Sequence, residues 1–408
     1  MVFRDNHMSV LFGHPTGSPN SHQAALAHLE AGHLGGFCVP WIPSQKTLRA
    51  LEFVKPLRPM AQRLSRRKFP PLEHAPTIQG RIGELRRLLT RGLPWGGNYL
   101  SNEANDWLMR TMARECRRSE ITAVHAYEDC SLLQFIEAKR LGKSCIYDMP
   151  IGYYPAWERI EAILSKKYRD WVTSGKTSSQ VRSEQKREEL ELADLLLVPS
   201  DFVFNTVREF YPGGQISIAR YGVDVTSWPA RSASVPENVM TFLFAGQCSL
   251  RKGIPLLLEA WKAADIKHAR LLLVGPWQLA EAKKYQLPPG CHWSGPVSSR
   301  ELRNFYHDAD VFVFPTNFEG RALVVGEALA SGLPVLTTDA SGAEDMVDET
   351  CGRIFSPEDL DALVGHLRWF NSNRDQLPEL SRAARHSANA FTWSKYRQCV
   401  TRAVAPFI

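Results

Sequence analysis

Residues 311–338 read VFVFPTNFEGRALVVGEALASGLPVLTT, a strand–loop–helix–strand pattern within a chain of 408 residues. The apolar run at 311–314 ends at Pro315, as a strand leaving a sheet does. A polar loop then leads into a helical stretch that stops at Ser331-Gly332, and a second apolar run follows at 335–338. This order predicts two parallel strands joined by a crossover helix.

Two glutamates stand eight residues apart in this unit, Glu319 on the loop and Glu327 inside the helix. A break at Gly320 lets Glu319 lie over the helix N-terminus, in the crevice where open α/β sheets bind ligands. Free amides of a first helical turn form an anion site, and Glu327 is placed one turn deeper to accept hydrogen bonds from a ribose. The amides expected to bind a diphosphate are those of Arg321, Ala322 and Leu323. Two solvated glutamates on a surface helix would give the same pattern, so the neighbouring motifs decide between this interpretation and a ligand site.

A second phosphate-binding element is predicted at 242–260, FLFAGQCSLRKGIPLLLEA. It contains a strand at 242–245, a loop and a helix that begins after Gly253. Arg251 and Lys252 precede that helix, where a lysine adds a point charge to the anion site made by free backbone amides. This charge would neutralise a departing diphosphate without a metal.

The two elements resemble the E-x7-E signature of retaining nucleotide-sugar glycosyltransferases, specifically glycosyltransferase family 4 of the GT-B fold. The resemblance implies an α/β protein of GT-B architecture, in which two Rossmann-like domains with parallel sheets face each other across a cleft. It also implies that Glu319 meets the donor sugar's hydroxyls, that Glu327 holds the ribose, and that Lys252 binds the phosphates. The match to the family's motifs is strong over residues 242–345 and weak over residues 20–190.

Further donor contacts follow from the same resemblance. The segments VGPW (274–277) and GPV (295–297) match the family's two loops around the nucleotide base, and GHPTGSPNS (13–21) resembles its first glycine loop. A turn that needs Gly and Pro for its conformation explains the last segment equally well. The residues implied in this way are Gly246, Gln247, Gly320, Val324, Pro276, Val297 and Gly17.

This chain departs from the family pattern at several positions. Gln247 stands where many members carry an arginine, so a second cationic contact would come from Arg251. Arg321 and Ala322 replace the family's Phe and second Gly, and Arg321 is a candidate to contact the diphosphate or the donor. These changes affect the identity of the donor more than the class of reaction.

The family's site histidine falls in the segment HAYED at 125–129. The best superposition places Tyr127 on that position, while His125 would face the sugar in a different register, so both are catalytic candidates. A single histidine in a strand is more often a structural residue. Asp148, in CIYDMP, is either a site residue or part of a turn before Pro150.

Apolar runs alternate with helical patterns along the whole chain, which favours parallel sheets. Candidate strands lie at 9–12, 123–126, 144–148 and 195–199 in a first half, and at 242–245, 271–274, 311–314 and 335–338 in a second. The segments ADLLLVPS (193–200) and ADVFVFPT (309–316) echo each other, and each is expected to end at the binding edge of its domain. We expect an acceptor domain at 1–220, a donor domain at 221–388, and a final helix at 389–408 that packs on the first domain.

Positive charge is concentrated in the first half of the chain. Residues 1–220 hold 30 Lys and Arg against 23 Asp and Glu, while residues 221–408 hold 19 against 20. Residues 55–91 alone contain ten basic and two acidic residues among Leu, Ile and Phe. Such a surface is either a solvated basic face or a site that docks on anionic lipid headgroups. Nucleic acid is disfavoured as a partner, because the segment lacks a helix-turn-helix pattern, RNP-type aromatics and zinc spacing.

No metal or other cofactor is expected. The eight cysteines are scattered without C-x-x-C pairs and read as buried thiols of a reducing cytosol. Asp308-Ala309-Asp310 resembles a metal-binding D-x-D, but it precedes the strand at 311–314, so we expect a structural role. The absence of a signal peptide or of a long apolar stretch predicts a cytoplasmic protein, bound at the periphery of the inner face of the plasma membrane if the basic segment docks there.

The predicted activity is transfer of a sugar from a nucleoside-diphosphate sugar to a glycan or lipid-linked acceptor, with retention at the anomeric carbon. Preorganised cations and amides would stabilise the departing diphosphate. Two alternatives use the same features: a GT-B nucleotide-sugar epimerase, and a non-catalytic subunit that binds nucleotide sugars. A nicotinamide oxidoreductase is disfavoured, because no G-x-G-x-x-G with a trailing acidic residue occurs.

Overall fold

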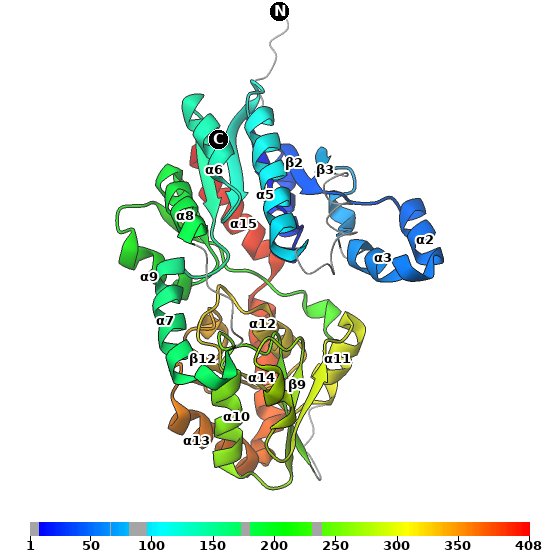
Figure 1. Cartoon of the computed structure of the whole chain (residues 1–408), viewed down its shortest axis with the longest axis vertical. Helices are drawn as coiled ribbons and strands as arrows, with labels where there is room; N and C mark the ends of the chain where they lie inside the picture. The colour runs from blue at the N-terminus through cyan, green and yellow to red at the C-terminus, as the bar shows by residue number, and fades with distance from the viewer. Residues whose placement is uncertain (1–7, 66, 81–95, 173–179, 231–238) are drawn as a thin grey trace, which may run out of the picture.

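The computed structural model describes residues 8–65, 67–80, 96–172, 180–230 and 239–408. Two parallel sheets lie one above the other along the long axis, each flanked by helices (Figure 1). The first has the strand order β3-β2-β1-β4-β5-β6-β7 and the second the order β10-β9-β8-β11-β12-β13. The predicted α/β class with two parallel, Rossmann-like sheets is confirmed.

The first sheet and its helices come mainly from the first 218 residues. Its strands are β1 (Ser9–Gly13), β2 (Leu34–Pro40), β3 (Thr77–Gly80), β4 (Ile121–Tyr127), β5 (Ser144–Asp148), β6 (Leu195–Val198) and β7 (Ile216–Ile218). The helices in this part are α1 (Pro19–Glu30), α2 (Gln45–Phe53), α3 (Arg58–Ser65), α5 (Gly96–Glu115), α6 (Leu132–Arg140), α7 (Tyr154–Lys167), α8 (Gln180–Leu192) and α9 (Asp201–Phe210).

The second sheet is built from residues 240–355. Its strands are β8 (Met240–Ala245), β9 (Ala269–Val274), β10 (Cys291–Gly295), β11 (Val311–Phe314), β12 (Val335–Thr338) and β13 (Gly352–Phe355). The helices that follow its strands are α10 (Ile254–Ala264), α11 (Ser299–Asp308), α12 (Leu323–Ala330), α13 (Leu360–Ser372), α14 (Leu377–Ala390) and α15 (Trp393–Val404).

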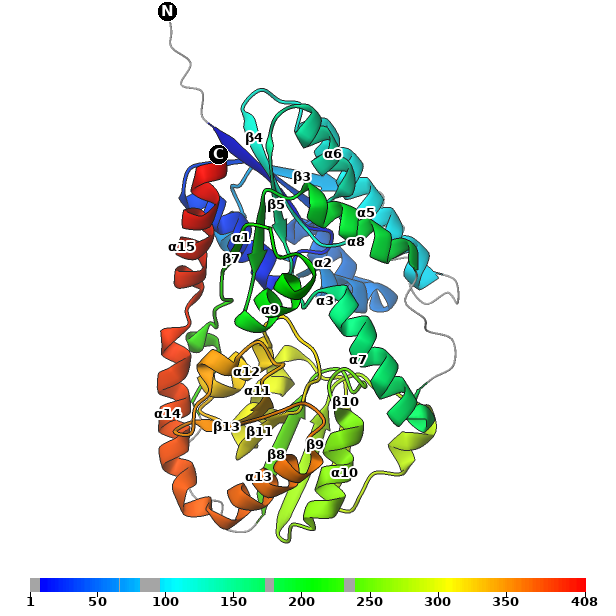
Figure 2. The ribbon, with the colours of Figure 1, turned by 90° about the vertical axis from the view of Figure 1, so that its left-hand side faces the viewer.

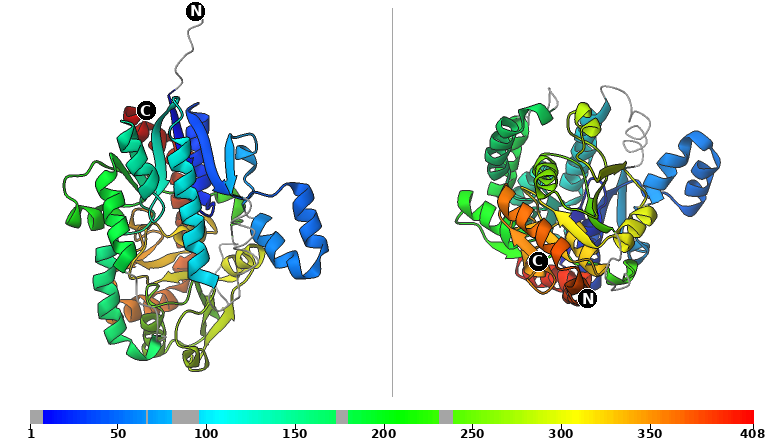
Figure 3. Two further views of the ribbon diagram at one scale, coloured as in Figure 1. Left: turned by 45° about the horizontal axis from the view of Figure 1, so that its top comes forward. Right: turned by 90° about the horizontal axis from the view of Figure 1, so that it is seen from below.

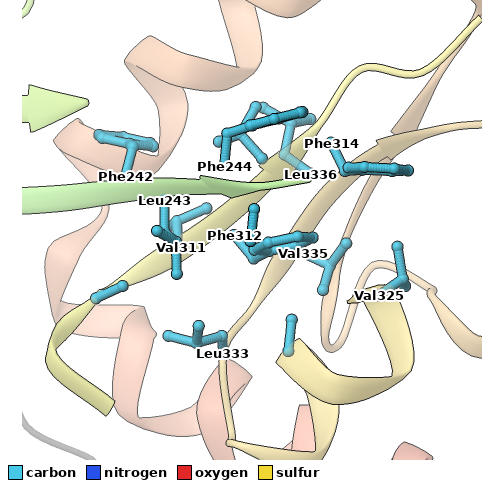
Figure 4. Close-up of a cluster of buried hydrophobic side chains, with 14 of the residues drawn as sticks. Phe242, Leu243, Phe244, Val311, Phe312, Phe314, Val325, Leu333, Val335 and Leu336 are labelled. Atoms are coloured by element: carbon cyan, nitrogen blue, oxygen red, sulfur yellow. The ribbon is translucent and has the colours of Figure 1, made fainter. Parts of the chain in front are cut away.

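Each sheet has its own apolar core. In the second, the side chains of β8, β11 and β12 pack together with α12, and every residue of these three strands is buried (Figure 4). Strands buried on both faces read as continuous apolar runs, because helices cover both faces of a parallel sheet. This burial explains why β5, β11 and β12 have the bounds predicted from such runs.

The echoing segments 193–200 and 309–316 form strands at different positions in their two sheets. β11 lies beside β8 at the point where the strand order reverses, a position held in the first sheet by β4 and not by β6. The shared feature is local. The Asp194 carboxylate accepts the Cys145 amide and the Asp310 carboxylate accepts the Thr241 amide, both at 2.8 Å, so each aspartate fixes the start of a neighbouring strand.

Two helical segments connect the halves. α15 returns to the first sheet and lies against α1, where Arg397 pairs with Glu30 at 2.7 Å (Figure 2). α7 runs beside both halves of the molecule. Arg159 near its start pairs with Glu209, and Lys167 at its end pairs with Glu358 of the second half. The two sheets are therefore held by contacts on opposite flanks.

Among the described residues, every helix is too short or too polar to cross a membrane.

Candidate active site

The two sequence motifs meet at the carboxyl ends of β8 and β11, next to the reversal of strand order. The Glu319 carboxylate contacts the Lys252 ammonium and lies 2.8 Å from the Arg251 guanidinium. Glu319 lies on the loop about one turn before α12 begins at Leu323, as the sequence predicts. Ligands bind at this edge in open α/β sheets, so the three charged groups occupy the crevice expected for a donor.

Lys252 is held in a confined environment. Its side chain is 12% exposed, and its Nζ lies 4.8 Å from the centroid of the Phe314 ring. Burial, together with the neighbouring Arg251 charge, lowers the pKa of Lys252 well below its ordinary value. The contact with Glu319 favours the charged ammonium, so the pair shields two charges that would otherwise be poorly solvated.

Glycine is required where the loops cross. Gly253 directly precedes α10 with φ of 68°, and a Cβ at this position would lie 1.9 Å from the Pro315 carbonyl oxygen. A Cβ on Gly275 would lie 1.9 Å from the Gly246 carbonyl oxygen. Any side chain would push these loops apart. The close approach fixes the loop of Lys252 on the loop that carries Glu319.

Glu327 lies in the second turn of α12 and is half-buried. The Tyr306 hydroxyl of α11 donates to its Oε2 at 3.4 Å. Burial raises the pKa of Glu327 to about 7, and the hydrogen bond from Tyr306 opposes that rise. A carboxylate with one modest partner in the protein retains the capacity to accept hydrogen bonds from a polyol.

Two expectations for the start of α12 are wrong. The Ala322 amide is not free, because it donates to the Ser341 carbonyl at 3.0 Å. The Arg321 side chain is buried and already has partners in the protein: it donates to the Tyr221 carbonyl and pairs with Asp345 at 2.7 Å. Within the described residues the amides of Leu323 and Val324 donate to no other part of the chain, which keeps them available to an anion.

The loop that carries Glu319 also contacts the first half of the chain. A Cβ on Gly320 would lie 1.7 Å from the Pro150 carbonyl oxygen, and the Ser200 hydroxyl donates to the Gly320 carbonyl at 2.5 Å. The Gly152 amide donates to the Glu319 carbonyl at 3.3 Å. Because these contacts join segments 120 or more residues apart, no local pattern in the sequence indicates them.

His125 is a buried structural residue. It has no exposed surface, its Nδ1 lies 2.8 Å from Nε2 of His28, and its Nε2 lies 3.6 Å from Asp148. This placement corrects its candidacy as a site histidine. Tyr127 is also buried, with its ring edge-on to His14 at 4.6 Å. Burial and the nearby Asp148 carboxylate raise the pKa of Tyr127 well above its ordinary value, so its hydroxyl stays protonated.

The remaining predicted contacts lie at loop positions of the two sheets. Pro276 accepts the Cys248 amide at 2.9 Å, which ties the loop after β9 to the loop of Gly246 and Gln247. Val297 follows β10 along the same edge and is half-buried. Gly17 lies in the loop before α1, where its amide donates to Nδ1 of His14 at 2.9 Å, so it belongs to the first half.

The sequence Asp308-Ala309-Asp310 does not form one site. Asp310 is buried and bonded to the start of β8, whereas Asp308 is exposed beside His307. The predicted structural role of Asp310 is confirmed. In the described part of the chain, a search for three or more His, Cys, Asp or Glu residues grouped as metal ligands finds no group.

Known proteins resemble this chain over part of its length. The family model described as glycosyl transferases group 1 matches residues 230–387. Glycogen synthase of Mycobacterium tuberculosis is 25% identical over 257 residues, which cover 60% of this chain and 61% of the relative. The sulfoquinovosyl transferase SQD2 of Arabidopsis thaliana is 28% identical over 219 residues, covering 49% and 42%. The chain thus spans about half the length of the curated relatives it matches.

Solved structures show the same fold over nearly the whole chain. Sucrose-phosphate synthase from Thermosynechococcus elongatus superposes with a TM-score of 0.66 at 18% identity, covering 96% of each chain. Alr3699/HepE of Anabaena, solved in complex with UDP, gives 0.63 at 15% identity and covers 98% of this chain and 100% of its own. The two-sheet arrangement is the GT-B fold, and residues 230–387 of this chain match the family model of the group 1 glycosyltransferases.

Proposed function

We propose that this protein is a retaining glycosyltransferase that moves a sugar from a nucleoside-diphosphate sugar to a glycan or lipid-linked acceptor in cell-surface polysaccharide or glycolipid biosynthesis. The contact of Lys252 and Arg251 with Glu319 carries the proposal, because it gathers two cations and a carboxylate in the crevice of the second sheet. The family match supports sugar transfer, and the UDP complex of HepE supports a nucleotide donor.

In the proposed reaction, Lys252 and Arg251 turn from Glu319 to the diphosphate when the donor binds. Their charges, together with the amides of Leu323 and Val324, stabilise the negative charge that develops on the leaving group. Glu319 is then released to accept hydrogen bonds from the sugar hydroxyls, and Glu327 accepts those of the ribose. The sugar's bond to the diphosphate breaks as the acceptor oxygen bonds to the same face of the anomeric carbon, and the acceptor's proton passes to the departing phosphate oxygen.

The test is release of nucleoside diphosphate from UDP-, GDP-, ADP- and TDP-sugars by the full chain. Slow release from one donor, with the transferred sugar retaining its anomeric configuration by NMR, supports the proposal. An epimerised donor without release would identify an epimerase instead. Donor-induced thermal stabilisation without turnover across acceptors would identify a binding subunit.

We also infer that the α2–α3 hairpin docks on an anionic membrane surface, on its cytoplasmic side. The hairpin projects from the first half of the molecule (Figure 3), and Phe53 at its tip is 88% exposed. Lys55 and Arg58 are exposed beside it. An exposed aromatic flanked by cations suits the headgroup region. The rest of the basic segment, 81–91, lies outside the described residues.

Sedimentation with vesicles tests this docking. Phosphatidylglycerol vesicles should pull down the protein and phosphatidylcholine vesicles should not, while Phe53→Ser should weaken the binding. Equal sedimentation with both lipids would contradict the inference.

A further inference from the structure

The end of α7, which runs beside both halves of the molecule in Figure 2, joins them through one carboxylate. Lys167 and Tyr168 both donate to Oε2 of Glu358, in the second half, at 2.9 Å and 2.7 Å. Further along, the Trp171 carbonyl accepts the Ala280 amide at 2.9 Å, and the Trp171 ring packs against the apolar core of the second sheet. The first half therefore reaches over the junction and holds one oxygen of Glu358.

The other oxygen of Glu358 faces the loop of the glutamate motif. The Asn317 side-chain amide donates to Oε1 of Glu358 at 3.0 Å and to the Leu250 carbonyl at 3.1 Å. The Asn317 backbone amide donates to the Arg251 carbonyl at 2.8 Å. Asn317 is 2% exposed, so these bonds are shielded from water. Asn317 therefore fastens the loop that contains Arg251 to the loop that carries Glu319.

The side chain and the backbone of Glu358 both suit a bridging position. A carboxylate accepts hydrogen bonds at both oxygens, so one oxygen can serve Tyr168 while the other serves Asn317. A glutamine in its place would have one accepting oxygen, and its NH2 group would face one of these two donors. The Glu358 backbone has φ of 63°, a left-handed conformation that residues other than glycine seldom adopt. Such conformations persist where surrounding contacts hold them, and they are concentrated at functional sites.

We propose that Glu358 is a positioning residue that couples the approach of the two halves to the alignment of Arg251 and Lys252 on the donor's diphosphate. This inference rests on the proposed function, because the leaving diphosphate is the group that these cations would stabilise. When the halves separate, Oε2 of Glu358 loses Lys167 and Tyr168, and the carboxylate turns to water. The side-chain amide bound to Oε1 then loses its partner, and the loop of the two cations loosens. Full stabilisation of the leaving group is therefore confined to the closed arrangement that excludes water.

The coupling should appear in kcat and not in the binding of the nucleotide. Attraction between a cation and a diphosphate falls slowly with distance, so a small shift of the loop changes the affinity little. A hydrogen bond to the leaving oxygen weakens steeply with distance and angle. Glu358→Gln, which preserves the size of the side chain, should therefore lower kcat about tenfold. Its affinity for the nucleoside diphosphate should stay within about twofold of that of wild type, and Tyr168→Phe should have the same two effects.

A double-mutant cycle on the full chain tests the coupling, with kcat measured as release of nucleoside diphosphate from UDP-, GDP-, ADP- and TDP-sugars. Because Tyr168 acts through Glu358, the variant that combines Glu358→Gln with Tyr168→Phe should lose no more activity than Glu358→Gln alone. Glu209→Gln is the matched control. It removes the carboxylate that pairs with Arg159 at 2.6 Å near the start of α7, within the first half, and it should release the nucleotide as fast as wild type does.

Hydrogen–deuterium exchange of the Asn317 backbone amide is a second readout, and it needs no activity. Tyr168→Phe and Glu358→Gln should each speed this exchange about fivefold, the change that the loss of one hydrogen bond produces. Unchanged exchange in both variants, or losses of kcat that add in the double variant, would overturn the coupling. If wild type releases nucleoside diphosphate and both variants release it equally fast, the coupling alone is overturned. If wild type releases none, the proposed transfer is contradicted, and faster Asn317 exchange in both variants still supports the link between the halves.

Discussion

The Lys252 ammonium and the Glu319 carboxylate are in contact although 67 residues separate them in the chain. Each comes from a loop that follows a central strand, β8 or β11, and these two strands are neighbours in the second sheet. The contact joins the phosphate-binding and sugar-binding motifs into one charged cluster. Both side chains are 12% exposed, so either group left alone would be poorly solvated.

Replacing Lys252 with alanine should lower kcat about 100-fold, the usual effect of removing one preorganised group that stabilises a leaving anion. Glu319 keeps its contact with Arg251, so the variant should fold. The measurement is single-turnover release of nucleoside diphosphate. Lys267→Ala is the control, because Lys267 is an exposed lysine of the same domain whose ion pair with Asp265 lies on the surface. A kcat equal to that of wild type in Lys252→Ala would rule out its role at the diphosphate.

Replacing Glu327 with alanine should raise the donor KM about tenfold or more, because two hydrogen bonds to the ribose are lost. Tyr306→Phe removes only the donor to Glu327 at 3.4 Å and should change KM much less. Initial rates at varied donor concentration measure both effects. An unchanged donor KM in Glu327→Ala would refute the ribose assignment.

The donor KM should depend on pH through Glu327. Its pKa of about 7 means that the carboxylate is protonated as the pH falls below 7, which removes its negative charge and half of its capacity to accept hydrogen bonds. The donor KM of wild type should therefore rise from about pH 8 to about pH 6. Glu327→Gln cannot titrate and should show a flat profile at this step. Parallel profiles for the two proteins would place the titrating group elsewhere.

Arg321 should matter for stability and not for the donor. Its buried guanidinium joins Asp345 to the interdomain carbonyl of Tyr221. Arg321→Ala leaves that carbonyl without its donor, while Asp345 keeps its second partner, Arg220, at 2.6 Å. The expected loss is about 2 kcal/mol of unfolding free energy, measured by urea denaturation, with the donor KM unchanged. Arg300→Ala, at an exposed position of α11, is the control. Unchanged stability with a raised donor KM would restore Arg321 as a donor contact.

The sequence predicts the bounds of a strand best where the strand is buried on both faces and forms an apolar run. β5, β11 and β12 are largely buried on both faces, and their apolar residues stand out as runs. β2 contains two adjacent glycines and ends at Pro40, and β10 alternates between buried and exposed positions. Neither strand gives such a run, and both were missed. The phosphate and glutamate motifs were found because each is local to one strand–loop–helix unit.

Roles that depend on distant partners could not be predicted. Arg321 reads as a donor contact beside Glu319, but its partners are Asp345 and a carbonyl of the interdomain segment. The Ala322 amide is satisfied by Ser341, which returns from the loop after β12. These features follow from tertiary packing, which overrides any local pattern.

The most direct test of the central claim is calorimetric titration of UDP, GDP, ADP and TDP into wild type, Lys252→Ala and Lys267→Ala. If the Lys252–Glu319 cluster receives the donor's diphosphate, one of the four should bind wild type and Lys267→Ala alike, and bind Lys252→Ala about tenfold more weakly or worse. Equal affinity of that nucleotide for all three proteins would contradict the account, because the diphosphate would then bind away from this cluster.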